Sequence, residues 1–357
     1  MAVYTTIDKP EDYFNTVIYS GSGSTGQTIT VGFQPDVIWV KARNQTYDHV
    51  LFDSNRGFST STTGTQISPN LNSAQPSTTG GHVGTVTSTG WTTQYGTAGT
   101  SLANVGDGSA TYVCWNWKSN GGTTVTNNDG SHTSTVQANP TAGFSIVTYT
   151  GTGSGFTLGH GLGAAPEIIF NKGLSDAHAW IVGATADSAN LSKVLILNDT
   201  DVSTTATANF NAAPTSSVYT IGTAGGVNNN GQNYISYLFR SIQGYSKIGV
   251  YYGNGGSDGT FIYTGFKPRF FMLKGTGNVS SWNMYDTKRD PINRASQQIK
   301  ANASNAEAST GAMDFLSNGI KIRTSDNDFN GSGNPYLYMA FADNPFVTSD
   351  KVPTTAK

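Results

Sequence analysis

The stretch that decides the fold is PDVIWVK at residues 35–41, which returns as PEIIFNK at 166–172 and as PRFFMLK at 268–274. Each version follows a Tyr-x-Gly-x-Gly segment, whose tyrosine (Tyr19, Tyr149 or Tyr251) precedes the proline by 16 or 17 residues. Each version is followed by a Tyr-led apolar segment, at 112–117, 234–239 and 336–341. A module written three times builds a shape or a binding surface more naturally than a unique catalytic constellation.

The composition favours strands and turns over helices. The 357 residues include 43 Gly, and only 12% are charged. The apolar run at 37–40 lacks a helical period and is bounded by a proline and a lysine, which predicts a strand buried on both faces with the lysine at its exit to solvent. We expect the Gly-x-Gly to form a tight hairpin turn and 112–117 to form a half-buried strand. The expected fold class is all-β, with three tandem β-sandwich-like repeats of jelly-roll or lectin-like type.

The spacing also predicts the boundaries of these units. A helical turn around Pro10 and a short helix at 302–310 are further expectations. The predicted segments are an N-terminal lead or attachment segment at 1–13, repeat 1 at 14–118, a linker at 119–142, repeat 2 at 143–243, repeat 3 at 244–346 and a C-terminal tail at 347–357.

Charge and cysteine content argue against several classes of partner. The net charge is −2, so nothing favours nucleic acid or an anionic membrane. No apolar run is long enough for a membrane-spanning helix, and the first twenty residues lack the pattern of a secretory signal. The single cysteine, Cys114, is expected to be a small buried apolar residue. The five histidines show no metal-ligand spacing, so we expect no metal and no cofactor.

Repeats 1 and 3 share an aspartate twelve residues after the lysine and an arginine three residues later. The pairs are Asp53 with Arg56 and Asp286 with Arg289, and repeat 2 lacks both residues. Two interpretations stay open: the pair binds the hydroxyls of a sugar, or the aspartate caps a turn and pairs with the arginine.

The exposed loops supply the rest of the candidate ligand site. Trp91 and Trp282 lie on glycine-rich segments, where an aromatic face can stack on a sugar ring or belong to the core of a small sandwich. Six residues form the predicted ligand-binding set: Asp53, Arg56, Trp91, Trp282, Asp286 and Arg289.

An enzymatic function finds little support in the sequence. No Gly-x-Ser-x-Gly elbow or Ser-His-Asp order is present, so we predict no catalytic residues. A depolymerase would require two carboxylates that converge in one cleft.

Several stretches resemble a family of virion proteins of marine and cyanobacterial tailed phages. They include 12–16, 32–41, 49–57, 115–118, 143–151, 159–163, 244–247 and 339–346. The resemblance implies a non-enzymatic particle component located in the virion, with other phage structural proteins as partners. It implies a tail-fibre-like protein that binds host-surface carbohydrate, with a capsid decoration or head-fibre protein as the alternative. Because fibres are usually threefold, we expect a homotrimer.

Overall fold

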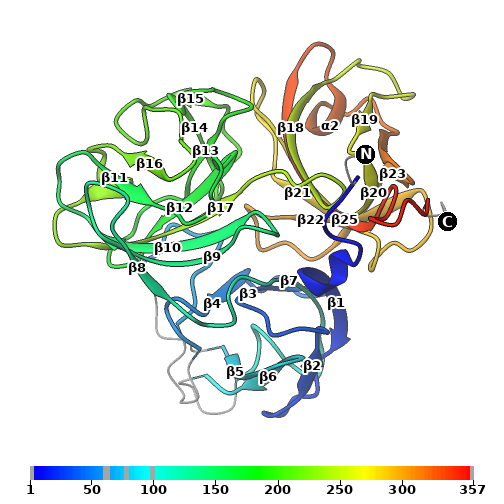
Figure 1. Cartoon of the computed structure of the whole chain (residues 1–357). Helices are drawn as coiled ribbons and strands as arrows, with labels where there is room; N and C mark the ends of the chain where they lie inside the picture. The colour runs from blue at the N-terminus through cyan, green and yellow to red at the C-terminus, as the bar shows by residue number, and fades with distance from the viewer. Residues whose placement is uncertain (1–3, 59–64, 76–79, 97–100, 354–357) are drawn as a thin grey trace.

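Strands make up nearly all of the regular structure, which confirms the all-β class. The computed structural model describes residues 4–58, 65–75, 80–96 and 101–353. In these residues the chain forms three lobes around a common centre (Figure 1). Repeat 1 is blue to cyan, repeat 2 green and repeat 3 yellow to red. Pro10 starts a 3-10 turn, Pro10–Asp12, so the helical turn expected there is present.

In the described part of the chain, the elements are strands with two one-turn α-helices. Repeat 1 contains β1 (Phe14–Ser20), β2 (Thr28–Thr30), β3 (Val37–Ala42), β4 (Val50–Asp53), β5 (His82–Thr87), β6 (Gly90–Gln94) and β7 (Thr111–Trp117). Next come β8 (Val125–Asn127), β9 (Ser134–Asn139), β10 (Phe144–Thr150), β11 (Phe156–Gly159), β12 (Ile168–Gly173), β13 (Ile181–Ala184), β14 (Lys193–Ile196), β15 (Thr204–Thr205), β16 (Val218–Ile221), α1 (Gly225–Asn228) and β17 (Asn233–Phe239). Repeat 3 contains β18 (Ser246–Tyr252), β19 (Phe261–Tyr263), β20 (Phe266–Gly275), β21 (Asn283–Asp286), β22 (Ala295–Lys300), β23 (Ala308–Leu316), β24 (Gly319–Ile322), α2 (Asn327–Asn330) and β25 (Pro335–Pro345).

One antiparallel order of four strands occurs in every lobe. The orders are β1-β7-β3-β4, β10-β17-β12-β13 and β18-β25-β20-β21. In each, the first strand pairs with the Tyr-led closing strand, which pairs with the strand that carries the apolar run after the repeated proline. The Tyr-x-Gly-x-Gly segment leads to a strand that does not pair with the first strand: β2 pairs with β6, β11 with β16 and β19 with β24. It is therefore not the hairpin turn we expected.

The central strand of each lobe is buried on both faces, as predicted. In β3, Ile38 and Val40 face a core that belongs to repeat 1, while Val37 and Trp39 belong to a cluster shared by all three repeats. The closing strand β7 divides in the same way, and Cys114 lies on the side of the repeat's own core. Strands β12 and β20 also contribute to both kinds of core. The apolar run is continuous because it serves two cores at once.

The tyrosines of the repeated signature form a stacked pair across neighbouring strands in every lobe. Their ring centroids lie 5.2, 5.3 and 5.0 Å apart. The pairs are Tyr19 with Tyr112, Tyr149 with Tyr234 and Tyr251 with Tyr336. The first glycine after the tyrosine is needed for close approach: a Cβ on Gly21 would lie 2.0 Å from a main-chain oxygen.

Several local predictions need correction. The lysines at 41, 172 and 274 are fully buried and do not mark an exit to solvent. The closing strand 112–117 is buried throughout and not half-buried, because its second face packs into the shared cluster. The segment expected as a linker contains β8 and β9, and β9 pairs with β10. Residues 302–310 form no helix, and β23 begins at Ala308.

The shared cluster predicts that the three lobes unfold together. Because each lobe's sheet buries one face against the other two lobes, guanidinium should unfold the chain in one cooperative transition. Far-ultraviolet circular dichroism and tryptophan fluorescence should give coincident curves. Separate transitions for one or two lobes would contradict a shared core.

Candidate functional site

The polar groups that recur in the repeats meet where one lobe touches the next. We call these contacts the seams; in each, a turn segment of one repeat (68–75, 196–203 or 300–307) meets the hairpin of the following repeat. The Trp180 Nε1 donates to the Ser68 carbonyl at 2.9 Å, and the Trp282 Nε1 donates to the Ile196 carbonyl at 2.8 Å. At the third seam, His49 Nε2 lies 3.1 Å from the Lys300 carbonyl. The third contact joins repeat 3 to repeat 1, so the ring of lobes closes.

A second set of hydrogen bonds repeats around the ring. The main-chain N–H of Gln75 donates to the Leu174 carbonyl at 2.8 Å, and that of Ser203 donates to the Thr276 carbonyl at 2.9 Å. The corresponding bond from Glu307 to Arg43 is 2.6 Å long. At this seam the Arg43 guanidinium also pairs with the Glu307 carboxylate at 2.8 Å. Each seam therefore combines a main-chain hydrogen bond with hydrogen bonds from side chains.

The three repeated lysines are buried at the same seams. The Lys172 ammonium donates to the carbonyl of Asn72 in the preceding repeat at 3.0 Å, and the Lys274 ammonium donates to that of Thr200 at 2.9 Å. Lys41 donates to the carbonyls of Ala42 and Gln45 within its own repeat. Burial lowers the pKa of each lysine to about 8. Each ammonium group thus stabilises a turn by donating hydrogen bonds to two main-chain carbonyls.

A neutral imidazole replaces the indole at the third seam. His49 accepts a hydrogen bond from the Trp39 Nε1 on its Nδ1 atom at 2.9 Å, which leaves Nε2 as the donor to the Lys300 carbonyl. Burial, and then the nearby charge of Lys41, lowers the pKa of His49 to about 3. The histidine therefore acts as a fixed donor, like the two tryptophans.

The Asp–Arg pairs are buried structural elements. Asp53 pairs with the Arg56 Nε at 2.6 Å and also accepts from the hydroxyl of Tyr237 in repeat 2 at 2.6 Å. Burial alone would lower the pKa of Arg56, but Asp53 and Tyr237 beside it raise the pKa above its ordinary value. The capping interpretation of the sequence motif therefore matches the geometry, since Asp53 also accepts from the Arg56 main-chain N–H at 3.0 Å.

The second pair has the same form. Asp286 pairs with the Arg289 Nε at 2.6 Å, and it accepts from the Trp115 Nε1 of repeat 1 at 3.1 Å. Arg289 also pairs with Glu307 at 3.0 Å.

Repeat 2 lacks the aspartate for a physical reason. Trp115 and Tyr237 occupy the same position of their closing strands, three residues after the leading tyrosine, and this position in repeat 3 is Met339. Methionine has no donor for a carboxylate to accept, and repeat 2 has the apolar Ala184 where the other repeats have aspartate. Acceptor and donor are thus lost together.

The six residues predicted to bind a ligand are too deeply buried to contact one. Asp53 and Trp91 are 0% exposed, Asp286 is 1%, Trp282 is 2% and Arg289 is 6%. Only 5% of the Arg56 side chain is exposed, on the wall of a shallow hollow between repeats 1 and 2. The prediction that these six residues contact a sugar is therefore corrected: five belong to the turns and seams, and Trp91 belongs to the core of repeat 1.

Sequence reasoning missed the asparagines that shape the turn segments. The side-chain oxygens of Asn70, Asn198 and Asn302 accept from the main-chain N–H of His49, Trp180 and Trp282 at 2.9, 2.8 and 2.8 Å. The available signal was an aliphatic residue three positions before each asparagine, in the strings ISPN, LILN and IKAN. It is weak because only two of the four positions are alike.

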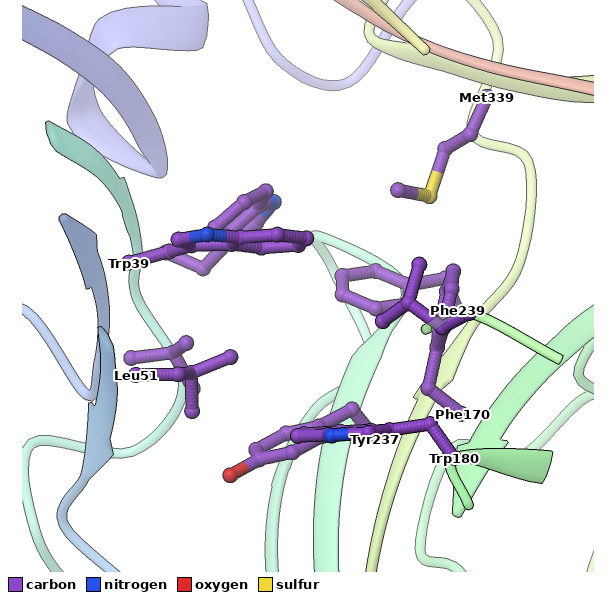
Figure 2. A pocket seen from close by; sticks show the side chains of 10 residues that line it. Trp39, Leu51, Phe170, Trp180, Tyr237, Phe239 and Met339 are labelled. Atoms are coloured by element: carbon purple, nitrogen blue, oxygen red, sulfur yellow. The ribbon is translucent and has the colours of Figure 1, made fainter. Parts of the chain in front are cut away.

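The centre of the molecule contains a small apolar cavity. Its volume is about 30 Å³, and all three repeats contribute to its wall. Figure 2 shows Trp39 and Leu51 facing Phe170, Trp180, Tyr237 and Phe239, with Met339 above them. A space of this size holds no more than about one water, and its lining is apolar. It is a packing gap at the junction of the lobes.

The described residues contain neither a cluster of metal ligands nor a membrane-spanning helix. Among residues 4–58, 65–75, 80–96 and 101–353, no three His, Cys, Asp or Glu side chains gather as a metal site. Within the same ranges, neither short helix has the length or the apolar character to span a membrane.

Comparison with known proteins gives a family match. A family model described as a domain of unknown function (DUF7483) matches residues 9–345. No curated protein matches the chain at a significant level.

Because Asp53 and Arg56 form a buried ion pair, we predict that Asp53→Ala strongly destabilises the fold. This change leaves the Arg56 charge buried without its carboxylate, and we expect it to lower the free energy of unfolding by about 3–5 kcal/mol. The triple variant Asp53→Ala, Arg56→Met, Tyr237→Phe removes acceptor, charge and donor together, just as the natural chain lacks the acceptor at Ala184 of repeat 2 and the donor at Met339 of repeat 3. It should recover most of the loss in guanidinium titrations. A triple variant as unstable as the single one would contradict the pairing argument.

The buried lysines predict a rise in stability with pH. Burial lowers the pKa of Lys172 from 10.5 to about 8, so above pH 8 the folded chain releases a proton that the unfolded chain still holds. The free energy of unfolding should therefore gain a rising contribution from pH 8 towards pH 9.5, and this contribution should be absent in Lys172→Met. The exposed Lys193→Met is the matched control and should keep the wild-type slope. Equal slopes in all three proteins would refute the prediction.

Proposed function

We propose that this chain, which belongs to the DUF7483 family of unknown function, is a non-enzymatic structural protein of a phage particle that attaches to carbohydrate on the host surface. Its partners are the other structural proteins of the particle, and it acts in the virion. The proposal rests on the resemblance to phage virion proteins and on the way the chain uses its repeated polar residues.

The observation that carries the proposal is the use of these polar residues in the seams. The three lysines, the Asp–Arg pairs and the indole or imidazole donors all bind groups within the chain. Such an arrangement holds three lobes in a fixed relation. A rigid body with many surface loops suits a protein that presents binding surfaces at the outside of a particle.

The ring of seams bears on the expected homotrimer. Because repeat 3 binds back to repeat 1 through Lys300 and Glu307, one chain completes the threefold arrangement by itself. A homotrimer stays part of the proposal as an assembly of complete chains, and light scattering on the purified protein tests it.

A capsid decoration or head-fibre protein is the second candidate. The closed ring favours it, since interlocked lobes resist being pulled apart and a mechanical role needs no ligand. The two candidates place the protein at different positions on the particle.

Location on the intact particle separates these roles. We expect antibodies against the chain, seen by electron microscopy, to label the tail tip or baseplate. Label spread over the head would favour decoration and contradict attachment to the host. Absence from purified particles, checked by mass spectrometry, would refute both roles.

A further inference from the structure

We infer that an exposed aromatic face of repeat 3, formed by Tyr252, Phe261 and Tyr263, is a saccharide-binding surface. This inference rests on the proposed attachment to carbohydrate and names the site that performs it. The three side chains are 65%, 43% and 58% exposed. Large exposed aromatic groups in one region of a surface indicate an interaction site.

The other two repeats provide an internal control for this face. Strand β19 is the counterpart of β2 and β11, and its central residue Ile262 is buried like Ile29 and Leu158. On both sides of the buried residue, β2 has Thr28 and Thr30 where β19 has Phe261 and Tyr263. The scaffold therefore forms this strand without aromatic residues.

The last residue of β18 also differs from its equivalents in the other two repeats. Tyr252 follows the stacked tyrosine of β18, and the equivalent residues are Ser20 in β1 and Thr150 in β10. All three positions are exposed. Repeats 1 and 2 have a small polar residue at this exposed position, so the fold does not require an aromatic residue there. Repeat 3 has a tyrosine.

Local contacts bring the aromatic residues to one edge of the lobe. The Thr260 hydroxyl donates to the Tyr252 carbonyl at 2.7 Å, which places the end of β18 beside the start of β19. The Phe261 ring lies over Gly319, where a Cβ would approach the ring to 3.0 Å. In Figure 1 both strands lie in the third lobe, and β19 lies close to the first described residues.

Tyr263 continues the face into a polar hollow. The hollow has a volume of about 380 Å³, and its wall includes Tyr4, Ser241, Gln243 and Lys247. The Tyr4 hydroxyl donates to the Gly265 carbonyl at 2.5 Å. Burial, followed by the hydrogen bond with Tyr263, raises the pKa of Tyr4 to about 12, so the Tyr4 ring presents a neutral hydroxyl at the wall of the hollow.

This combination matches the chemistry of a sugar. Aromatic faces pack against the C–H face of a pyranose ring, while hydroxyl, amide and ammonium groups pair with its hydroxyls. A volume of about 380 Å³ lies within the range of small-ligand pockets. Lys247 at the wall adds a cation that can pair with the carboxylate of an acidic sugar.

The test uses the full chain on an array of purified bacterial O-antigen and capsular oligosaccharides. Affinities for the saccharides it binds are then measured by titration calorimetry. The variant Tyr252→Thr, Phe261→Thr, Tyr263→Thr introduces residues that the other repeats already have at these positions, and it should fold normally by circular dichroism. We expect at least about a tenfold loss of affinity, which corresponds to 1.4 kcal/mol. Ile18→Thr, which removes an exposed apolar side chain from β1, is the matched control and should bind like the wild type.

The possible results separate an error in the location of the site from an error in the proposed attachment to carbohydrate. If the wild type and the triple variant bind the same saccharide equally well, this site is wrong and carbohydrate attachment stands. If the wild type binds no saccharide, both the site and the proposed attachment fall. If the triple variant instead abolishes self-association or incorporation into particles while no sugar is bound, the face is a protein contact and the inference is overturned.

Discussion

Hydrogen bonds from buried ring N–H groups to main-chain carbonyls of the preceding repeat are the constraint on which the other features depend. A buried donor without a partner destabilises a fold by about 1–3 kcal/mol, so each hairpin requires its neighbour's turn in one position. Trp180 and Trp282 satisfy this requirement with indoles, and His49 satisfies it with a neutral imidazole. With the turn held in place, the lysine ammonium has a carbonyl of the neighbouring repeat within reach at two seams.

The shared cluster explains why charged groups lie so deep. Because the sheet of each lobe buries both faces, any polar residue on β4 or β21 must find its partner inside the protein. Asp53 finds one on repeat 2 and Asp286 finds one on repeat 1. A buried pair adds little net stability over an apolar replacement, but removing one member is strongly unfavourable. Repeat 2 has Ala184 at this position, which agrees with the idea that the pair defines geometry more than it adds stability.

Much of the fold could be predicted from the sequence, because its signals are local. The apolar run at 37–40, the Pro10 turn and the burial of Cys114 depend on neighbours along the chain and on hydrophobicity. The candidate site could not be predicted in the same way. Lys41 ends the apolar run of β3 and Arg56 follows β4, so the sequence predicts both as surface residues, but both side chains are buried. The sequence contains the three repeats but no direct signal that their sheets share a core.

Comparison among the repeats separates what the fold requires from what it permits. The positions of Asn70, Asn198 and Asn302 have the same contact in all three repeats, so the fold explains them completely. Where a repeat lacks the aspartate, the neighbouring repeat also lacks the side-chain donor that would bind it. Packing therefore explains the differences at these positions as well. Exposed positions that differ with no compensating change nearby have no such explanation. Because the polar groups that recur at the seams bind one another, function is to be sought where the repeats diverge at the surface, and not where they agree.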